Sequence, residues 1–317
     1  MNYWWVNHKQ TYKDERGGNY IWSPQRNKDG STNQTYTNLT KVRPGDIVFS
    51  YANGVIGALG VAADQYFQSD RPVSFGEIGE QWDKNGWKVP VNWTLLSKTI
   101  SPKDYLTQIG PLLPERHSPI QRQSGNGNQG CYLASISAEL GTLLISLATR
   151  DGNLEIRDSL GDLVDSVADE KEERRIKADR TLPETTREAL IKARIGQGQF
   201  RDNVEARETG CRVTAVTDKR FLIASHMKPW RVSSNGERLD GANGLLLSPH
   251  IDKLFDHGWI SFADNGDLLV ATECPAEVLV KWNVKVCAQR RPFSNEQKRY
   301  LRYHREQVFG RRNATEE

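Results

Sequence analysis

The first 150 residues contain short runs in which aromatic and β-branched side chains concentrate. Gly, Pro and Asn bound these runs, which is typical of strands. The runs cover residues 46–51, 55–62, 88–96 and 131–136. A different period appears between Ser137 and Thr149, where four leucines recur at three- and four-residue spacing and predict a helix. We therefore expect a small β-barrel with a few helices.

Residues 151–193 follow another pattern. Apolar residues between Leu160 and Val167 recur three and four positions apart, which predicts one short amphipathic helix that trails into a solvated, charged stretch. A second helix is predicted to open at Leu182-Pro183-Glu184, because proline and an acidic residue favour the first helical turn. We interpret 151–193 as an acidic helical linker between a domain of residues 1–150 and one of residues 194–317.

The charge of the chain supports this division. Its 317 residues carry 43 basic and 40 acidic side chains, a formal charge of only +3. Residues 1–150 hold 15 basic and 12 acidic side chains, residues 151–180 hold 6 and 10, and residues 181–317 hold 22 and 18. Two mildly basic modules thus flank an acidic connector, so the small net charge does not exclude a nucleic-acid partner.

Other compositional features narrow the class of protein. The hydrophobic fraction of 37% and charged fraction of 26% indicate a globular chain. No apolar run approaches the roughly 20 residues of a membrane span, and the N-terminus lacks a secretory signal, so we expect a cytoplasmic protein without a membrane partner. The four cysteines are expected to be reduced and mostly buried: Cys131, Cys211, Cys274 and Cys287.

Tryptophan is concentrated in the first module, where six of the nine occur before residue 100. Trp4, Trp5 and Trp93 lie in predicted strands and are expected to fill the core. Trp22 and Trp82 lie in loops flanked by Gly, Asn and Pro, where a large indole can face a ligand.

The order of several segments resembles the PUA-like superfamily, closest to its EVE members and similar to the YTH modified-base readers. These segments are Tyr3-Trp4-Trp5, Tyr20-Ile-Trp22-Ser23-Pro24, Arg43-Pro-Gly-Asp46 through Tyr51, and Gly57 through Ala62. The resemblance implies a pocket for a flipped, methylated base, with Trp22 and Ser23 on one wall and Trp82, or alternatively Trp87, on the other. The predicted base contacts are Trp22, Ser23, Asn38, Ser50, Tyr51 and Trp82, with Asn53 as a further candidate. The alternative that Asn38, Ser50 and Asn53 only bond their own backbone stays open.

The strongest signal lies between Arg194 and Phe262. A predicted strand ends at His226, a Pro-Trp turn and a polar loop follow, and a second strand begins at Asn243. A helix opened by proline then carries Asp252 and Asp256 four residues apart. This spacing places both carboxylates on one helix face, which suits a shared divalent cation with hard oxygen ligands.

This segment resembles the HNH (ββα-metal) nuclease family in the motifs Ala224-x-His226-x-x-Pro-Trp and Asn243-Gly-Leu-x-Leu-x-x-x-x-Asp252-x-Leu-Phe-Asp256. The resemblance implies that His226 is the general base, that Asn243 ties the hairpin and orients that base, and that Asp252 and Asp256 bind Mg²⁺ or Mn²⁺. Where many members have a metal ligand before the base, this chain has Ser225. Coordination would then rely on the two aspartates and water, or recruit His250 or His257.

Basic side chains around this segment complete the predicted site. Arg201, Lys228 and Arg231 are expected to hold DNA phosphates. The tail from Lys298 to Arg305, with Arg311 and Arg312, either extends this basic surface or forms a solvated amphipathic helix.

The two resemblances together imply an α+β protein: a PUA-like barrel, a helical linker and a ββα-metal domain. A modified-base reader joined to a nuclease suggests a modification-dependent restriction endonuclease for double-stranded DNA with 5-methyl- or 5-hydroxymethylcytosine. An HNH site cuts one strand at a time, so a homodimer would suit double-strand cleavage. Two alternatives stay open: an unspecific or RNA-directed HNH nuclease, and a modified-base reader with a non-catalytic HNH module.

Overall fold

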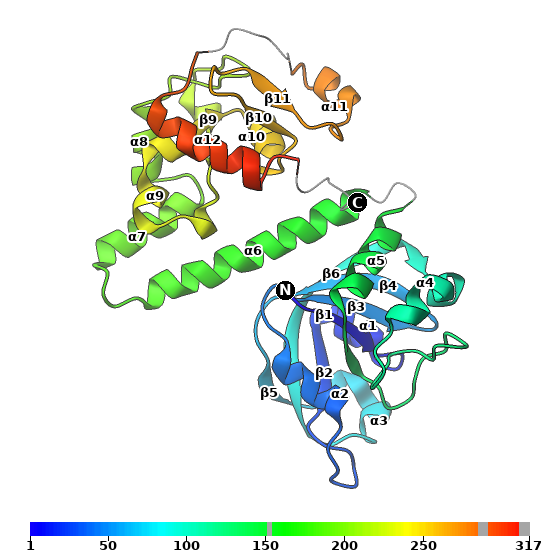
Figure 1. The fold of residues 1–317 in the computed structure, drawn as a ribbon. Helices are drawn as coiled ribbons and strands as arrows, with labels where there is room; N and C mark the ends of the chain where they lie inside the picture. The colour runs from blue at the N-terminus through cyan, green and yellow to red at the C-terminus, as the bar shows by residue number, and fades with distance from the viewer. Residues whose placement is uncertain (151–153, 285–290, 311–317) are drawn as a thin grey trace. The chain divides into compact units, whose positions relative to one another are not determined.

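The computed structural model describes residues 1–150, 154–284 and 291–310. Its internal contacts divide the chain into two units, Met1–Ala168 and Asp169–Glu317 (Figure 1). The expected α+β class is confirmed. Cys131, Cys211 and Cys274 are buried free thiols, whereas Cys287, Arg311 and Arg312 lie outside the described residues.

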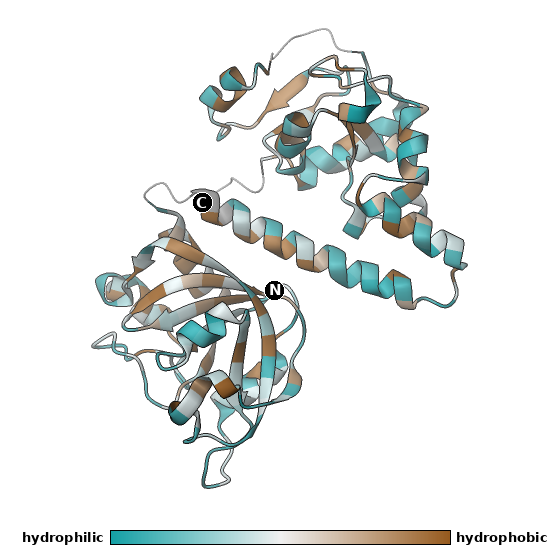
Figure 2. Ribbon diagram, turned by 180° about the vertical axis from the view of Figure 1, so that it is seen from behind, coloured by the Kyte–Doolittle hydropathy of each residue, from teal (hydrophilic) through white to brown (hydrophobic). Residues whose placement is uncertain are grey.

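A curved seven-stranded sheet forms the centre of the first unit, with strand order β2-β6-β4-β3-β1-β7 and β5 paired to β6. Its curvature follows from β6, whose first residues pair with β2 and β5 while the later ones pair with β4. The four predicted strands are present, and hydrophobic residues are frequent along the sheet (Figure 2). The strands are β1 (Tyr3–Asn7), β2 (Tyr20–Pro24), β3 (Ile47–Ala52), β4 (Val55–Ala62), β5 (Phe67–Asp70), β6 (Asn85–Ile100) and β7 (Leu133–Ile136).

Helices accompany this sheet, and the predicted one after Ser137 is confirmed. Ser137 caps it by accepting a hydrogen bond from the backbone of Leu140 at 3.2 Å. Trp4 and Trp5 are buried in the core, as expected, and Trp93 is partly buried against it. The helices are α1 (Tyr12–Gly17), α2 (Gln34–Thr37), α3 (Gly76–Gly79), α4 (Leu106–Leu112) and α5 (Ala138–Thr149).

The prediction of one short linker helix is wrong, because α6 (Leu154–Ala178) is a single helix of 25 residues. Leu160 and Val167 pack into the core of the first unit, whereas Ile176 belongs to the core of the second. The acidic part is not merely solvated: Glu172 pairs with Arg238 at 2.7 Å, and Glu173 pairs with Arg194. Much of this later part is coloured hydrophilic in Figure 2. Ion pairs therefore stabilise the later part of α6, which lies beyond the apolar residues predicted to form the helix.

The second unit contains the predicted strand–strand–helix order. Strands β8 (Ile223–His226) and β9 (Gly244–Leu247) pair antiparallel, from Ile223 opposite Leu247 to His226 opposite Gly244. Helix α10 (Pro249–Asp256) follows with Pro249 in its first turn. The remaining elements are α7 (Glu184–Arg194), α8 (Gln199–Glu205), α9 (Asn235–Leu239), β10 (Ile260–Phe262), β11 (Leu268–Val270), α11 (Ala276–Lys281) and α12 (Asn295–Gln307).

Helix α12 is amphipathic. Tyr300, Leu301 and His304 are buried, while Arg299 and Arg305 form ion pairs at its surface. Among the helices that the structure describes, none combines the length and apolar character that a membrane span needs.

Candidate functional site

His226 is the last residue of β8, and two contacts fix its ring. The imidazole stacks on Phe200 with ring centroids 3.7 Å apart and planes 4° from parallel. Its Nε2 lies 3.1 Å from the carbonyl oxygen of Arg238. A carbonyl can only accept, so Nε2 carries the hydrogen and Nδ1 keeps its lone pair. Burial lowers the pKa of His226 to about 4, so the ring is neutral at pH 7 and its Nδ1 is a weaker base than that of an ordinary histidine.

Asn243 is fully buried and closes the loop between β8 and β9. Its Oδ1 accepts a hydrogen bond from the backbone N–H of Lys228 at 2.8 Å. Its Nδ2 donates to the carbonyl oxygens of Lys228 at 3.3 Å and Glu237 at 3.1 Å. Glu237 directly precedes Arg238, so the amide of Asn243 fixes the segment whose next carbonyl holds His226.

Asp252 and Asp256 lie on α10, and Ser225 of β8 connects to them. The Ser225 hydroxyl donates a hydrogen bond to Asp256 Oδ1 at 3.2 Å. Removal from water raises the pKa of Asp252. Desolvation of the carboxylate, and next the charge of Asp252, raise the pKa of Asp256, whose residue as a whole is exposed at the end of α10. The two carboxylates therefore repel each other, and the charges of Arg231 and Lys253 offset this repulsion only in part.

This pair fits a divalent cation. Asp252 Oδ1 is buried without a hydrogen-bond partner, which is costly for a charged oxygen unless another group satisfies it. Within the described ranges, no three His, Cys, Asp or Glu side chains gather where they could hold a metal ion. A cation here would take the two carboxylates and complete its shell with the Ser225 hydroxyl or water. The ring of His250 instead contacts Trp282, with centroids 5.8 Å apart, and His257 is buried at the end of α10.

The three basic residues predicted to bind phosphate have protein partners. Arg201 pairs with Glu205 at 2.8 Å and donates to two backbone carbonyls. Lys228 pairs with Glu237 at 2.7 Å. The positive charge of Arg231 acts on the carboxylate of Asp256. Phosphate binding by these side chains stays a prediction, and at Arg201 and Lys228 a phosphate would compete with a carboxylate.

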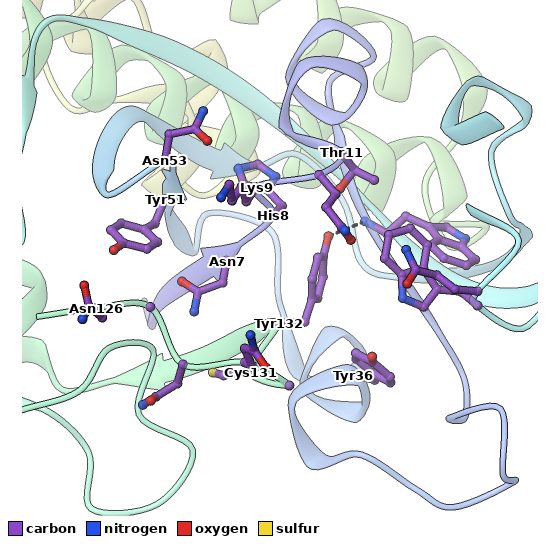
Figure 3. A pocket seen from close by; sticks show the side chains of 18 of the residues that line it. Asn7, His8, Lys9, Thr11, Tyr36, Tyr51, Asn53, Asn126, Cys131 and Tyr132 are labelled. Atoms are coloured by element: carbon purple, nitrogen blue, oxygen red, sulfur yellow. Dashed lines mark hydrogen bonds between the residues drawn. The ribbon is translucent and has the colours of Figure 1, made fainter. Parts of the chain in front are cut away.

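The first unit contains a pocket of about 870 Å³ (Figure 3). Trp22, Phe75 and Trp82 line part of it and pack edge to face. Their ring centroids are 5.7 Å apart for Trp22–Phe75 and 5.9 Å apart for Phe75–Trp82. Trp22 and Phe75 are buried, with 2% and 5% of their surface exposed, so the partly buried Trp82 is the ring of this cluster that is most open to a ligand.

The predicted base contacts divide into two groups. Trp22, Tyr51 and Trp82 line the pocket, as does Asn53. The expectation that Trp22 lies in a loop is wrong, because Trp22 is part of β2 and is buried against Phe75. Ser23, Asn38 and Ser50 are not among the described residues that line the pocket. All three are buried and form hydrogen bonds within the protein: Ser23 to the carbonyl of Tyr36 at 3.4 Å, Asn38 to the carbonyl of Leu133 at 2.8 Å, and Ser50 with His8 Nε2 at 2.7 Å. Trp87 packs against the core of the sheet.

Sequence reasoning missed a buried network beside the pocket. Glu15 is fully buried, accepts hydrogen bonds from Tyr132 and Thr11 at 2.9 Å, and lies 2.6 Å from His8 Nδ1. The Tyr132 hydroxyl in turn accepts from the backbone N–H of Trp22 at 2.9 Å (Figure 3). This network holds the strand that carries Trp22. Phe75 was also missed. It is an aromatic residue in the same loop as Trp82, seven positions earlier, and this could have indicated that it contributes to the same aromatic cluster.

Two comparisons with known proteins found matches. Residues 211–263 match a family described as HNH endonuclease, whose members generally use divalent metal ions. No curated protein matches the chain. Among solved structures, the chain is similar to the Pho92 YTH domain in complex with m6A, at 15% identity over 48% of this chain and 88% of that one, with a TM-score of 0.34.

Two further solved structures show the same level of similarity. One is human THYN1 in complex with DNA containing 5-methylcytosine, at 13% identity over 48% of this chain and 99% of that one, with a TM-score of 0.32. The other is the YTH domain of Zygosaccharomyces rouxii MRB1 in complex with N6-methyladenosine RNA, at 11% identity over 47% of this chain and 88% of that one, with a TM-score of 0.32.

Proposed function

We propose that this protein is a modification-dependent restriction endonuclease. It binds a flipped 5-methyl- or 5-hydroxymethylcytosine in the pocket of the first unit, and it hydrolyses DNA in the second unit with His226 as the general base. One observation carries the proposal: a neutral histidine held by a backbone carbonyl shares a ββα unit with two carboxylates that repel each other, one of which has a buried oxygen without a hydrogen-bond partner. That unit lies within the segment that matches the HNH endonuclease family.

The chemistry assigned to the second unit is phosphodiester hydrolysis. Nδ1 of His226 takes the proton of the attacking water, while the Arg238 carbonyl holds the opposite side of the ring. Asp252 and Asp256 would hold Mg²⁺ or Mn²⁺, which when bound supplies charge for the scissile phosphate and the leaving oxygen. Arg231, whose charge already reaches Asp256, is placed to attract the DNA phosphate.

The chemistry assigned to the first unit is recognition of a methyl group. A methyl group forms no hydrogen bond, so a close apolar surface must detect it, and the aromatic cluster supplies one through its partly exposed ring, Trp82, which rests on the buried Phe75 and Trp22. Stacking on an aromatic ring contributes about 1–3 kcal/mol per base, which can offset much of the few kcal/mol needed to unstack it. Gln10 and Gln81 also line the pocket and can bond the polar edge of the base.

A cleavage assay tests the proposal. The protein is incubated with Mg²⁺ or Mn²⁺ and with matched duplexes that are unmodified or carry 5-methylcytosine, 5-hydroxymethylcytosine or N6-methyladenine, alongside RNA. We expect cleavage of the DNA with modified cytosine. Equal cleavage of every DNA would favour an unspecific nuclease, cleavage of RNA an RNA-directed one, and binding without cleavage a non-catalytic HNH module.

Two variants separate the units. His226→Ala should abolish cleavage and keep binding, whereas Trp22→Ala should remove the preference for modified DNA. His250→Ala is the matched control, because the ring of His250 contacts Trp282 and cleavage should persist. Unchanged discrimination by Trp22→Ala would show that the pocket is not the reader.

A further inference from the structure

The loop between β5 and β6 forms one rim of the pocket and is braced from within. Arg71 donates hydrogen bonds to the carbonyl oxygens of Gly79 at 2.6 Å and Trp82 at 2.8 Å. Phe75 is buried and packs against both Trp22 and Trp82. The brace and the buried ring give this loop a defined shape, so its outward side chains are held in place.

Val73 is the outward side chain that stands out. It is 95% exposed, more than any other large hydrophobic residue in the described part of the chain. It lies two residues before Phe75, so its backbone is within roughly 7 Å of a residue that lines the pocket. A ligand that covers a fully exposed aliphatic group at the edge of a binding pocket binds more tightly, because apolar surface is removed from water.

We infer that Val73 enters the base stack of duplex DNA at the position vacated by the flipped base; this inference rests on the proposed function. When a base leaves the duplex, its neighbours lose their stacking partner and a gap opens beside the protein. An apolar side chain inserted there restores dispersion contacts and keeps the base from returning. Val73, Phe75 and Trp82 sit on one braced loop, and Trp22 of β2 packs against Phe75. The side chain that fills the gap and the surface that receives the base are therefore fixed relative to each other.

Binding to two forms of the same oligonucleotide tests this inference. The full chain, with a chelator to suppress cleavage, is titrated with a fluorescent duplex carrying one 5-methylcytosine and with the corresponding single strand. Val73→Ala should bind the duplex about tenfold more weakly, which corresponds to about 1.4 kcal/mol. Its affinity for the single strand should stay within twofold of wild type, because a single strand leaves no gap to fill. Val73→Leu should retain duplex binding.

Controls distinguish failure of this inference from failure of the proposed function. Leu95→Ala removes a similar exposed aliphatic group, 65% exposed on β6, that is not among the described residues lining the pocket, and should leave both affinities unchanged. Trp22→Ala should weaken binding to duplex and single strand alike. If Trp22→Ala has this effect while Val73→Ala binds the duplex as wild type does, the wedge role is refuted and the pocket stands. If Trp22→Ala changes neither affinity, the proposed reader fails first.

Discussion

Replacing Asn243 with alanine is expected to destabilise the second unit by about 3 kcal/mol. The side chain is fully buried and makes three hydrogen bonds of 3.3 Å or shorter to the backbone of Lys228 and Glu237. Each bond contributes about 0.5–1.5 kcal/mol, and backbone groups left unpaired cost about 1–3 kcal/mol each. Partial access of water to the widened loop lowers the total. For a domain of roughly 150 residues this corresponds to a Tm lower by about 10 °C.

Thermal and urea unfolding of the full chain, followed by tryptophan fluorescence and circular dichroism, measure this effect. Asn265→Ala is the matched control, because Asn265 is exposed in the turn between β10 and β11 and should cost less than about 1 kcal/mol. Cleavage should also fall in Asn243→Ala. The variant no longer holds the backbone at Glu237, and the next carbonyl, that of Arg238, positions His226. If Asn243→Ala unfolds within 1 kcal/mol of wild type, the loop closure assigned to this amide is wrong.

Three further predictions follow from burial, packing and charge. Burial lowers the pKa of His304 from 6.5 to about 4, so the unfolded chain takes up a proton at this residue before the folded chain does as pH falls; the stability of wild type relative to His304→Gln in urea unfolding should therefore fall by about 2 kcal/mol from above pH 6.5 to pH 5, and a difference that does not change with pH would contradict this. A Cβ on Gly86 would lie 2.3 Å from the indole of Trp22, so Gly86→Ala should lower the preference for modified DNA at least tenfold in the cleavage assay, unlike Gly17→Ala, where the space is open. Mg²⁺ or Mn²⁺ at about 100 times its Kd should stabilise the protein by about 2.7 kcal/mol in thermal unfolding, and an equal shift in Asp252→Asn would exclude that ligand.

The nuclease-like site could be predicted closely because its parts are local in sequence. One hairpin and the following helix carry His226, Asn243, Asp252 and Asp256, and strand and helix periods alone place these side chains. The partners of His226 could not be predicted this way. Phe200 and the Arg238 carbonyl come from α8 and α9, and only tertiary packing brings them to the ring.

The pocket could be predicted only in part, and alternation along strands explains why. Trp22 and Ser23 are neighbours on β2, and Ser50 and Tyr51 are neighbours on β3. Successive side chains of a strand point to opposite faces, so one of each pair lines the pocket and the other enters the interior. Sequence patterns gave no sign of Glu15 either, because its partner Tyr132 is 117 residues away.

The continuous α6 has a practical consequence for dissecting this protein. A cut at residue 150 would strip Ile156, Leu160 and Val167 from the core of the first unit. A cut at residue 180 would remove Glu172 from Arg238 in the second. A cut between Ala168 and Asp169 would divide the 25 residues of α6, and the second piece, which begins at Asp169, would be shorter than the roughly 12–15 residues that a helix needs to persist alone. Fragments that fold should therefore overlap, with both the first-unit and the second-unit fragment retaining the whole of α6.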